Sequence, residues 1–401
     1  MELLIKGARI IDYYQDFIGD IYIADGIINK IGVNLNDDCL KIDGKGLVVM
    51  PSFVDLHVHF REPGFTIKED IESGSKAAVK GGYTMVNLMA NTNPVCSNMD
   101  TVNYVLKRAS QVGILDVHQC VSITDNFEGK DTSHLDKLDD KVKIISEDGK
   151  DVMDSAVMLR AMVKAKKSGR IVMCHSEDHS LSHRDMRLAE NIMTWRNITL
   201  SEFTGCAVHV AHVSTKEAME YIIEAKIKGV NITCEVAPHH IVLYENDYRV
   251  NPPIRTEKDR NFLIKSIKEG WVDTISTDHA PHTAEDKRKG APGISGIETA
   301  FSLCYTNLVK NGHITLNKLS ELMSKNPSDI LGVKKGRITP GYDGDLVLLD
   351  LNKEYKIQGD KFLSKGKNTP FEGYRVFGDI VKTIKAGKIV FDNASDWSWN
   401  L

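Results

Sequence analysis

Short runs of apolar and β-branched residues recur along the middle of the chain, with polar stretches between them. Eight such runs lie between residues 51 and 280: SFVDLHV, YTMVNLM, ILDVHQCV, VKIIS, RIVMCH, AVHVAH, VNITCEVA and VDTIST. Short apolar runs bounded by turn-forming residues are typical of strands buried on both faces, as in a parallel sheet.

Amphipathic stretches at helical spacing separate most of these runs. Examples are residues 70–82, 151–169 and 214–229, and the second begins with Asp and ends with basic residues and Gly, as helices do. Eight strands alternating with helices over about 250 residues predict an α/β fold of the (β/α)₈ TIM-barrel type. A doubly wound open sheet is the alternative, but no G-x-G-x-x-G or G-x-x-x-x-G-K follows the first run.

Both ends of the chain have a different pattern. Residues 1–50 and about 336–393 carry short alternating runs punctuated by Gly and Asp, which is typical of antiparallel strands and hairpins. We therefore expect a small composite β-sandwich built from residues 1–50 plus 336–401, and a barrel formed by residues 51–335. The polar segment 279–295, which contains Gly and Pro and follows the eighth run, suits a mobile loop at a functional site.

Composition narrows the class of protein. Apolar residues make up 42% and charged residues 26% of the 401 residues, and the net charge of −4 gives no electrostatic reason to expect nucleic acid as a partner. No apolar run approaches the roughly 20 residues needed to cross a membrane, and the N-terminus does not resemble a signal peptide. The seven cysteines are scattered, odd in number and without a C-x-x-C pair, which favours reduced thiols in a cytoplasmic protein.

Histidines and acidic residues gather where the predicted barrel strands end, which is where TIM-barrel enzymes place their functional groups. The first run ends in a His-x-His pair, whose two imidazoles point to the same face because residues two apart on a strand do so. The full set consists of His57, His59, Asp148, His175, His212 and Asp278.

Each of these residues has an ordinary interpretation when taken alone. A single histidine at a strand end is more often a core or surface residue than a ligand, and Asp favours turns and helix caps. The metal hypothesis rests on the joint occurrence, because chance would have to place these groups at the same ends of five of eight strands. Five other histidines are assigned no role. His118, His134, His183 and His313 have no partner at a useful spacing, and His209 faces away from His212.

The ligand types indicate zinc. Neutral imidazoles and carboxylates suit Zn²⁺, and a metal lowers the pKa of a bound water from about 15.7 toward about 7. Six ligands are many for one metal and natural for two, so Asp148 could bridge two ions while Asp278 transfers a proton between water and nitrogen. Lys143, another residue of the fourth run, lies five residues before Asp148, so strand parity directs its side chain to the opposite face. Asp148 is therefore the better candidate for a residue that bridges two metal ions.

Several longer motifs resemble the amidohydrolase superfamily and, more closely, its type I dihydroorotases. The resemblance covers essentially the whole chain, and HFREPG together with NPPIR and TDHAPH separates it from hydantoinases and allantoinases. The motifs are DLHVHFREPG (55–64), ANTNP (90–94), SEDG (146–149), CHSED (174–178), AHVST (211–215), EVAPHH (235–240), NPPIR (251–255), TDHAPHT (277–283) and FLSKGKNTPFEG (362–373).

The resemblance implies the reversible, zinc-dependent cyclisation of N-carbamoyl-L-aspartate to dihydroorotate, a step of pyrimidine biosynthesis. A hydroxide shared by two zinc ions would be the nucleophile in the hydrolytic direction, and Asp278 the general acid/base. The implied zinc ligands are the six residues above. The implied substrate contacts are His59, Arg61, Asn93, Asn251, His282 and Gly293.

Arg61 is the contact that physical chemistry supports best. A planar guanidinium binds a carboxylate through two hydrogen bonds, and Arg61 follows His59 by two residues at the expected barrel mouth.

The sequence departs from the family pattern in three places. Residues Met89-Ala90-Asn91-Thr92 stand where relatives often have Met-Pro-Asn-Thr, and the segment 179–206 is more compact than in many relatives. A third is that the stretch around Gly293 is one residue shorter than in the family, so this contact is the least specific of the set.

Two other functions fit parts of the pattern. One is a hydantoinase or dihydropyrimidinase acting on a related cyclic amide. The other is a non-catalytic scaffold for aspartate transcarbamoylase, which the presence of all six ligands disfavours. The expected partners are a small-molecule substrate, a second copy of the chain and, as an option, aspartate transcarbamoylase, with neither nucleic acid nor membrane.

Overall fold

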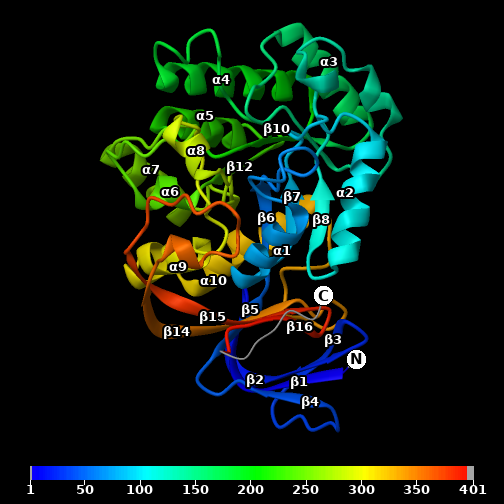
Figure 1. The fold of residues 1–401 in the computed structure, drawn as a ribbon, viewed down its shortest axis with the longest axis vertical. Helices are drawn as coiled ribbons and strands as arrows, with labels where there is room; N and C mark the ends of the chain where they lie inside the picture. Colours follow the sequence, from blue (N-terminus) through cyan, green and yellow to red (C-terminus); the bar gives the residue numbers. More distant parts are fainter. Residues whose placement is uncertain (1, 395–401) are drawn as a thin grey trace.

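Eight parallel strands form a closed barrel in the computed structural model, which describes residues 2–394 (Figure 1). One stretch of the barrel has the order β6-β7-β8 and the other β13-β12-β11-β10-β9, and parallel bridges from Val58 to His279 and from Val121 to Ile145 join them. The eight predicted runs and the TIM-type barrel are therefore confirmed. The barrel strands are β6 (Phe53–Val58), β7 (Tyr83–Leu88), β8 (Asp116–Gln119), β9 (Ile144–Ser146), β10 (Ile171–Cys174), β11 (Val208–Val210), β12 (Ile232–Val236) and β13 (Thr274–Ile275).

Helices surround the barrel. The three stretches singled out in the sequence form α1, α3 and α5, and the caps Asp70, Asp154 and Thr215 accept hydrogen bonds from the first backbone N–H groups of each. The helices are α1 (Ile71–Lys80), α2 (Met99–Val112), α3 (Ser155–Lys167), α4 (Met186–Thr204), α5 (Lys216–Ile227), α6 (Pro238–Val242), α7 (Glu257–Lys268), α8 (Ala284–Arg288), α9 (Ala300–Cys304), α10 (Leu316–Ser320) and α11 (Asn326–Leu331). Short 3₁₀ or π segments are η1 (Asp125–Phe127), η2 (Ser133–Lys137), η3 (Tyr305–Lys310), η4 (Glu321–Lys325) and η5 (Gly359–Lys361).

The strands of the two chain ends form one eight-stranded sheet in the order β16-β15-β14-β5-β1-β2-β3, with β4 paired to β1. The antiparallel pairing of β5 with β14 joins the N-terminal strands to the C-terminal ones. Apolar residues from both halves share one core, as Ile10, Ile21, Leu348 and Ile384 do. The strands are β1 (Glu2–Ile11), β2 (Asp16–Ala24), β3 (Ile27–Gly32), β4 (Leu40–Asp43), β5 (Val48–Pro51), β14 (Leu346–Lys356), β15 (Arg375–Lys385) and β16 (Lys388–Asp392).

This sheet is the composite β domain that the sequence predicts, and Figure 1 shows it as a separate layer at one end of the barrel. The domain limits themselves, 1–50 plus 336–401 and 51–335, remain a prediction, and residues 395–401 lie outside the described part. Strand β5 ends at Pro51, and only Ser52 separates it from β6. Because the connection is so short, the barrel and the β domain are fixed closely to one another.

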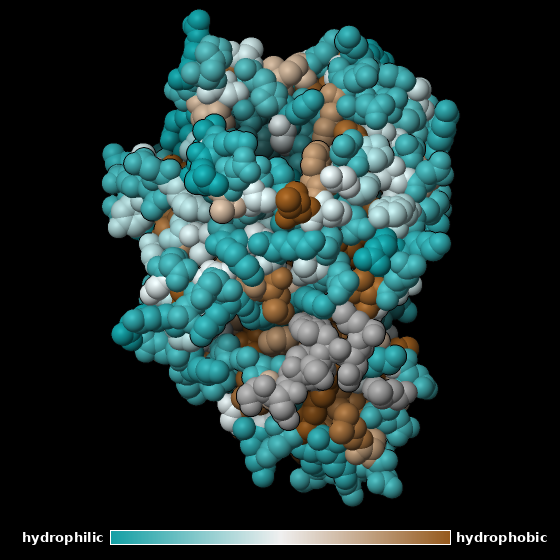
Figure 2. Space-filling view, in the orientation of Figure 1, coloured by the Kyte–Doolittle hydropathy of each residue, from teal (hydrophilic) through white to brown (hydrophobic). Residues whose placement is uncertain are grey.

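The segment between β14 and β15 returns to the barrel. Its Asn368 accepts a hydrogen bond from the backbone N–H of His282 and donates one to the carbonyl of Gly293, at 3.0 and 2.9 Å. The face of the molecule drawn in Figure 2 is mainly hydrophilic, with apolar side chains in small patches. Within residues 2–394, no helix is both long enough and apolar enough to span a membrane.

Candidate metal centre at the barrel mouth

The six predicted ligands come together at one end of the barrel. His57 is the penultimate residue of β6 and His59 directly follows that strand. Asp148 follows β9, and the other three residues follow β10, β11 and β13. All six are buried. Their convergence is a consequence of the parallel barrel, which places the carboxyl ends of all strands on one face.

Asp148 lies at the centre of the cluster. Its Oδ1 is 3.2 Å from His57 Nε2, and its Oδ2 is 3.4 Å from His59 Nε2. The same Oδ1 lies 3.3 Å from His175 Nδ1 and 3.7 Å from His212 Nε2. One carboxylate thus faces four imidazoles, as a bridging ligand would.

Asp278 also lies close to the His-x-His pair. Its Oδ1 lies 3.3 Å from His59 Nε2 and 3.7 Å from His57 Nε2. Two overlapping groups of possible ligand atoms lie within 4.8 Å of one another, His57 with Asp148 and His212, and His57 with His59 and Asp278. Two groups that share a histidine are compatible with two neighbouring metal positions.

The electrostatics of the cluster favour a positive charge. Burial lowers the pKa of His57, but Asp148 and Glu235 outweigh it and raise that pKa well above its usual value. Likewise, burial lowers the pKa of His175, but Asp148 and Glu177 raise it to about 10. Burial raises the pKa of Asp278, but His59 and His57 lower it to about 2.

Two atoms of the cluster show that these residues fit a metal. His57 Nε2 and Asp148 Oδ1 are buried and 3.2 Å apart, yet neither has a hydrogen-bond partner within residues 2–394. Unsatisfied buried polar atoms are rare and call for an explanation such as an ion. The donor set of imidazole nitrogens and carboxylate oxygens is one that zinc accepts, so a zinc ion would satisfy both atoms.

Three side chains behind the ligands were missed by the sequence reasoning. Glu235 Oε1 lies 2.7 Å from His57 Nδ1, and Asn91 Oδ1 lies 2.9 Å from His59 Nδ1. Such outer partners fix the orientation of a metal-binding histidine. Glu235 could have been noticed as the single charged residue within the apolar run VNITCEVA.

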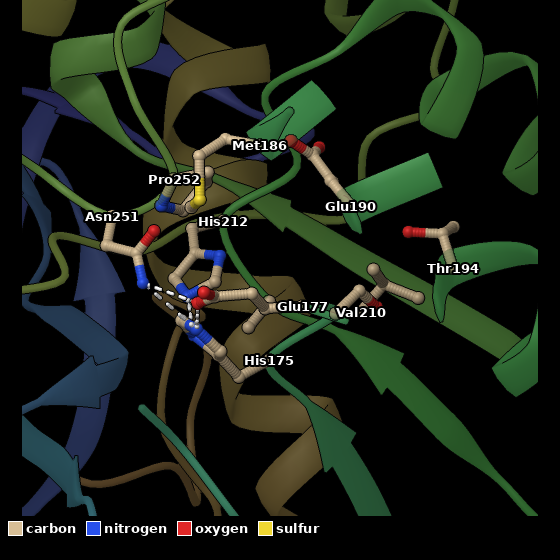
Figure 3. Close-up of a pocket in the computed structure, with 11 residues that line it drawn as sticks. His175, Glu177, Met186, Glu190, Thr194, Val210, His212, Asn251 and Pro252 are labelled. Carbon is tan, nitrogen blue, oxygen red and sulfur yellow. Dashed lines mark hydrogen bonds and ion pairs between the residues drawn. The ribbon is translucent and has the colours of Figure 1, made fainter. Parts of the chain in front are cut away.

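The third is Glu177, which Figure 3 shows between His175 and Asn251. Its Oε2 lies 3.0 Å from His175 Nε2 and accepts a hydrogen bond of 2.6 Å from Asn251 Nδ2, while its Oε1 lies 3.3 Å from His179 Nδ1. Burial raises the pKa of Glu177, but the neighbouring histidines and Asn251 hold it well below its usual range. Glu177 therefore connects a metal-facing histidine to a predicted substrate contact.

Asp55 joins the two strands that carry the His-x-His pair and Asp278. Its carboxylate accepts hydrogen bonds from the backbone N–H of His57 and from the backbone and hydroxyl of Thr277. Complete burial raises its pKa to about 7, although these hydrogen bonds lower it. Like Glu235, it is a lone charged residue in a buried strand.

Three site residues have a left-handed backbone: Arg61, His212 and Asp278, with φ of 62°, 32° and 47°. This conformation costs a residue with a side chain roughly 1–2 kcal/mol. Such strain persists where the surrounding structure imposes it, and it gathers at functional sites.

A cavity of about 200 Å³ lies over the cluster. Of the predicted substrate contacts, five line it: His59, Arg61, Asn251, His282 and Gly293. Arg61 Nη2 lies 3.4 Å from His282 Nε2, and Arg61 Nε is buried without a partner. Burial and the Arg61 charge lower the pKa of His282 to about 3, so its imidazole is neutral at pH 7.

The predicted contact Asn93 is not among the described residues that line this cavity. It is exposed, and its backbone N–H donates to the carbonyl of Pro63. Asn91, two residues earlier in the same motif, lines the cavity instead. Asn93 as a substrate contact stays a prediction.

The segment 279–295 contains α8, capped by Thr283. Lys287 Nζ donates to the carbonyls of Arg249, Ala291 and Gly293, at 3.2, 2.8 and 3.0 Å. These contacts hold Gly293 at the cavity, where an added Cβ would lie 2.6 Å from the carbonyl of Ala280. The mobility of segment 279–295 stays a prediction.

The histidines without a predicted role do not line the cavity. His209 is buried and contacts Thr233 and Glu235, and His118 and His134 make hydrogen bonds to other parts of the core. His183 and His313 are exposed.

Comparison with known proteins agrees with this geometry. Residues 48–390 match the amidohydrolase family. The chain is 53% identical to a dihydroorotase of Clostridium botulinum, over 98% of this chain and all of the relative, and 41% identical to a dihydroorotase of Thermoanaerobacter sp., over 98% and 97% of the two chains. Among solved structures, the L-hydantoinase (dihydropyrimidinase) of Arthrobacter aurescens aligns with a TM-score of 0.91 at 25% identity, over 99% and 97% of the chains. The dihydropyrimidinase of Brevibacillus agri aligns with a TM-score of 0.89 at 23% identity, over 98% and 95%, and shares the fold.

Proposed function

The chain belongs to the amidohydrolase family and, within it, to the dihydroorotases, and we propose that it interconverts N-carbamoyl-L-aspartate and dihydroorotate with the residues described above. The position of Arg61 is the observation that supports this choice of substrate. Its guanidinium lines the same cavity as five of the six clustered residues, and its buried Nε has no hydrogen-bond partner among the described residues. A site for a small carboxylate beside a metal centre suits this substrate.

We propose that His57, His59, Asp148, His175, His212 and Asp278 hold two zinc ions, with Asp148 between them. Bound zinc would supply a Lewis acid that polarises the reacting carbonyl and lowers the pKa of water. The unpartnered His57 Nε2 and Asp148 Oδ1, and the surplus of negative charge, support this assignment.

Asp278 is the proton carrier in this proposal. Its lowered pKa keeps it ionised at neutral pH, so it can accept a proton. In the hydrolytic direction it takes a proton from the attacking water and delivers it to the ring nitrogen as the C–N bond breaks. In the synthetic direction it takes the proton from the carbamoyl nitrogen and gives it to the departing carboxylate oxygen, which leaves as water with a second proton taken from the solvent.

The remaining contacts orient the substrate. Arg61 binds the α-carboxylate through its planar guanidinium, together with Asn93. Asn251 and the neutral His282 hold the ring, and the backbone at Gly293 closes the cavity. Burial of Arg61 strengthens its attraction for a carboxylate, because charges interact more strongly away from water.

An assay of the purified chain with four substrates tests the proposal: carbamoyl aspartate, dihydroorotate, hydantoin and dihydrouracil. We expect turnover of the first two. Turnover of hydantoin without dihydroorotate would instead assign the hydantoinase activity. Less than one zinc per chain together with no turnover would favour the scaffold for aspartate transcarbamoylase.

We further propose that the enzyme acts in the cytoplasm as a homodimer and can associate with aspartate transcarbamoylase. All seven cysteines are free, which suits a reducing compartment.

A further inference from the structure

A loop that starts and ends in the β domain reaches the barrel mouth. Residues 357–374, which we call the strap, connect β14 to β15, and Figure 1 shows them extending from the β domain to the barrel. The backbones of Ile357 and Tyr374 pair at 2.9 Å, and Phe362 and Phe371 are buried in one apolar cluster. A loop whose ends are joined and whose own side chains pack is held as one unit. The strap contains the motif FLSKGKNTPFEG, which supplies none of the proposed metal ligands or substrate contacts.

Two buried carboxylates of the barrel fix the first half of the strap. Glu298 accepts hydrogen bonds from the backbone N–H groups of Leu363 and Ser364, at 2.8 and 3.0 Å. Glu69 accepts one from the hydroxyl of Ser364 and one from the backbone N–H of Lys365. Burying a carboxylate is costly unless it is hydrogen-bonded, so these contacts stabilise both partners. The strap is therefore attached to the barrel just before the chain reaches the mouth.

One amide of the strap joins the two ends of the polar segment that follows β13. Oδ1 of Asn368 accepts hydrogen bonds from the backbone N–H of His282 and the hydroxyl of Ser295, both at 3.0 Å. Its Nδ2 donates to the carbonyls of Gly293 and Ala280, at 2.9 and 3.4 Å. An asparagine amide offers two lone pairs on its oxygen and two N–H groups. All four positions of Asn368 are therefore used on this one segment.

We propose that Asn368 is a positioning residue of the candidate site, which sets how far the backbone of His282 lies from that of Gly293. Both of these residues line the cavity, whereas Asn368 is not among the described residues that do. Asn368 thus acts through its partners and not on the substrate directly. The inference deepens the proposed function and rests on it, since His282 and Gly293 are substrate contacts there. Asn368 sets the width of the cavity on the side where the substrate ring is held.

The close fit between the strap and this segment defines the position of Asn368. An added Cβ at Gly366 would lie 2.6 Å from the Cβ of Pro281, and 2.8 Å from Ser295 Oγ and from Asn368 Oδ1. There is no space for a side chain between the two segments at this point. The backbone carbonyl of Asn368 also accepts the N–H of Ser295 at 2.8 Å. Because this contact needs no side chain, a substitution of Asn368 leaves the strap attached and removes only the amide contacts.

Steady-state kinetics of Asn368→Ala with carbamoyl aspartate and dihydroorotate test the proposal. Loss of a contact that holds the ground state and the transition state equally raises KM and leaves kcat unchanged. We expect KM to rise about tenfold, the effect of losing one hydrogen bond of ordinary strength, while kcat and zinc content keep their natural values. Asn352→Ala, which changes an exposed asparagine on β14, is the matched control and should leave KM unchanged. The natural KM in an Asn368→Ala chain that circular dichroism shows to be folded, or a joint loss of kcat and zinc, would overturn the proposal.

Hydrogen exchange at the His282 amide tests the same contact without any substrate. Asn368→Ala removes the acceptor of this N–H, so its exchange should become faster than in the natural chain. Asn368→Asp keeps an acceptor oxygen but cannot donate to Gly293, so the His282 amide should stay protected while KM still rises. Unchanged exchange in Asn368→Ala would show that Asn368 does not hold His282. If the natural chain turned over hydantoin and not dihydroorotate, the proposed function would fail, yet faster exchange in Asn368→Ala would still support the positioning of His282.

Discussion

Asp278 shows how one residue can contribute to two tasks. It lies within reach of both imidazoles of the His-x-His pair, and it lines the cavity where Arg61 and Asn251 also face. Its left-handed backbone is imposed by the end of β13, where Asp55 holds the preceding Thr277. Position and ionisation are therefore set by residues other than Asp278 itself.

Replacing Asp278 with Asn tests its role as the proton carrier. The amide keeps the size of the side chain but cannot accept the proton, so we expect kcat to fall by at least about a thousandfold, near the upper range for a lost general acid/base. Steady-state kinetics in both directions measure the effect, and circular dichroism verifies the fold. Turnover at the natural rate would contradict the role.

Replacing Arg61 with Met tests the carboxylate contact. A charge-assisted hydrogen-bonded pair contributes about 1.5–3 kcal/mol, so KM should rise roughly ten- to a hundredfold with a smaller change in kcat. Arg61→Lys should restore only part of the affinity, since an ammonium lacks the paired geometry. An unchanged KM in Arg61→Met would place the carboxylate elsewhere.

Replacing Glu177 with Gln tests a residue that the sequence alone did not indicate. The neutral amide weakens the support of His175 and loosens Asn251, so zinc affinity should fall by about ten- to a hundredfold, the usual cost of losing such a partner. Competition with a chelator measures that affinity without reference to activity, and KM is expected to rise as well. Asp178→Asn, one residue along the chain, is the matched control because, in the part of the chain that the structure describes, the side chain of Asp178 accepts hydrogen bonds only from Ser180. Equal zinc affinity in both variants would refute the positioning role.

The residue scale also shows how far the sequence could predict the site. The clustering of the six proposed ligands could be predicted because strand ends converge in a parallel barrel, which is a property of the fold. Glu177 and Asn91 act through side-chain directions within loops, which no periodicity encodes.

At the scale of the element, the strands were predicted well because their patterns are local. Apolar runs without alternation identify buried parallel strands, and capping residues identify the starts of α1, α3 and α5. Contacts between side chains on neighbouring strands could not be predicted, because they depend on the strand register. The sequence offers no partner for His118, yet its Nδ1 lies 2.6 Å from Asn87 Oδ1 on β7, and its Nε2 accepts a hydrogen bond from the backbone N–H of Lys143, which precedes β9.

His118 gives a prediction about pH and stability. Burial, with a smaller contribution from Lys143, lowers its folded pKa to about 4, below the usual value of 6.5. A proton therefore binds the unfolded chain more tightly, so the stability that His118 contributes is complete above about pH 6.5 and is lost as the pH falls toward 4. A shift of this size corresponds to about 3 kcal/mol.

Urea unfolding between pH 7 and pH 4 measures this effect in His118→Gln, which cannot titrate. The natural chain should lose up to about 3 kcal/mol more stability over this range than the variant. His313→Gln alters an exposed histidine and should follow the natural chain. Parallel curves for the natural chain and His118→Gln would exclude the assigned pKa.

At the scale of the whole molecule, a buried ion cluster joins the barrel to the β domain. Lys335 is 4% exposed, and its Nζ lies 2.8 Å from Asp116 on β8 and 2.5 Å from Asp345 beside β14. Lys385 on β15 also contacts Asp116, at 3.0 Å. Burial lowers the pKa of Lys335, but Asp345 and Asp116 raise it above its usual value. The sequence predicted that the two chain ends meet in one β domain, but charges so far apart in the chain could not be paired from it.

Replacing Lys335 with Met would leave the buried Asp345 without its positive partner. Removing one member of a buried ion pair typically costs about 3–5 kcal/mol, because the remaining charge stays uncompensated. We expect a lower midpoint of thermal and urea unfolding, while the barrel mouth, which Lys335 does not line, keeps its zinc affinity. Lys334→Met is the matched control, since this neighbouring side chain is exposed. Equal stability of the two variants would mean that the chain connections and apolar contacts, rather than these charges, hold the β domain against the barrel.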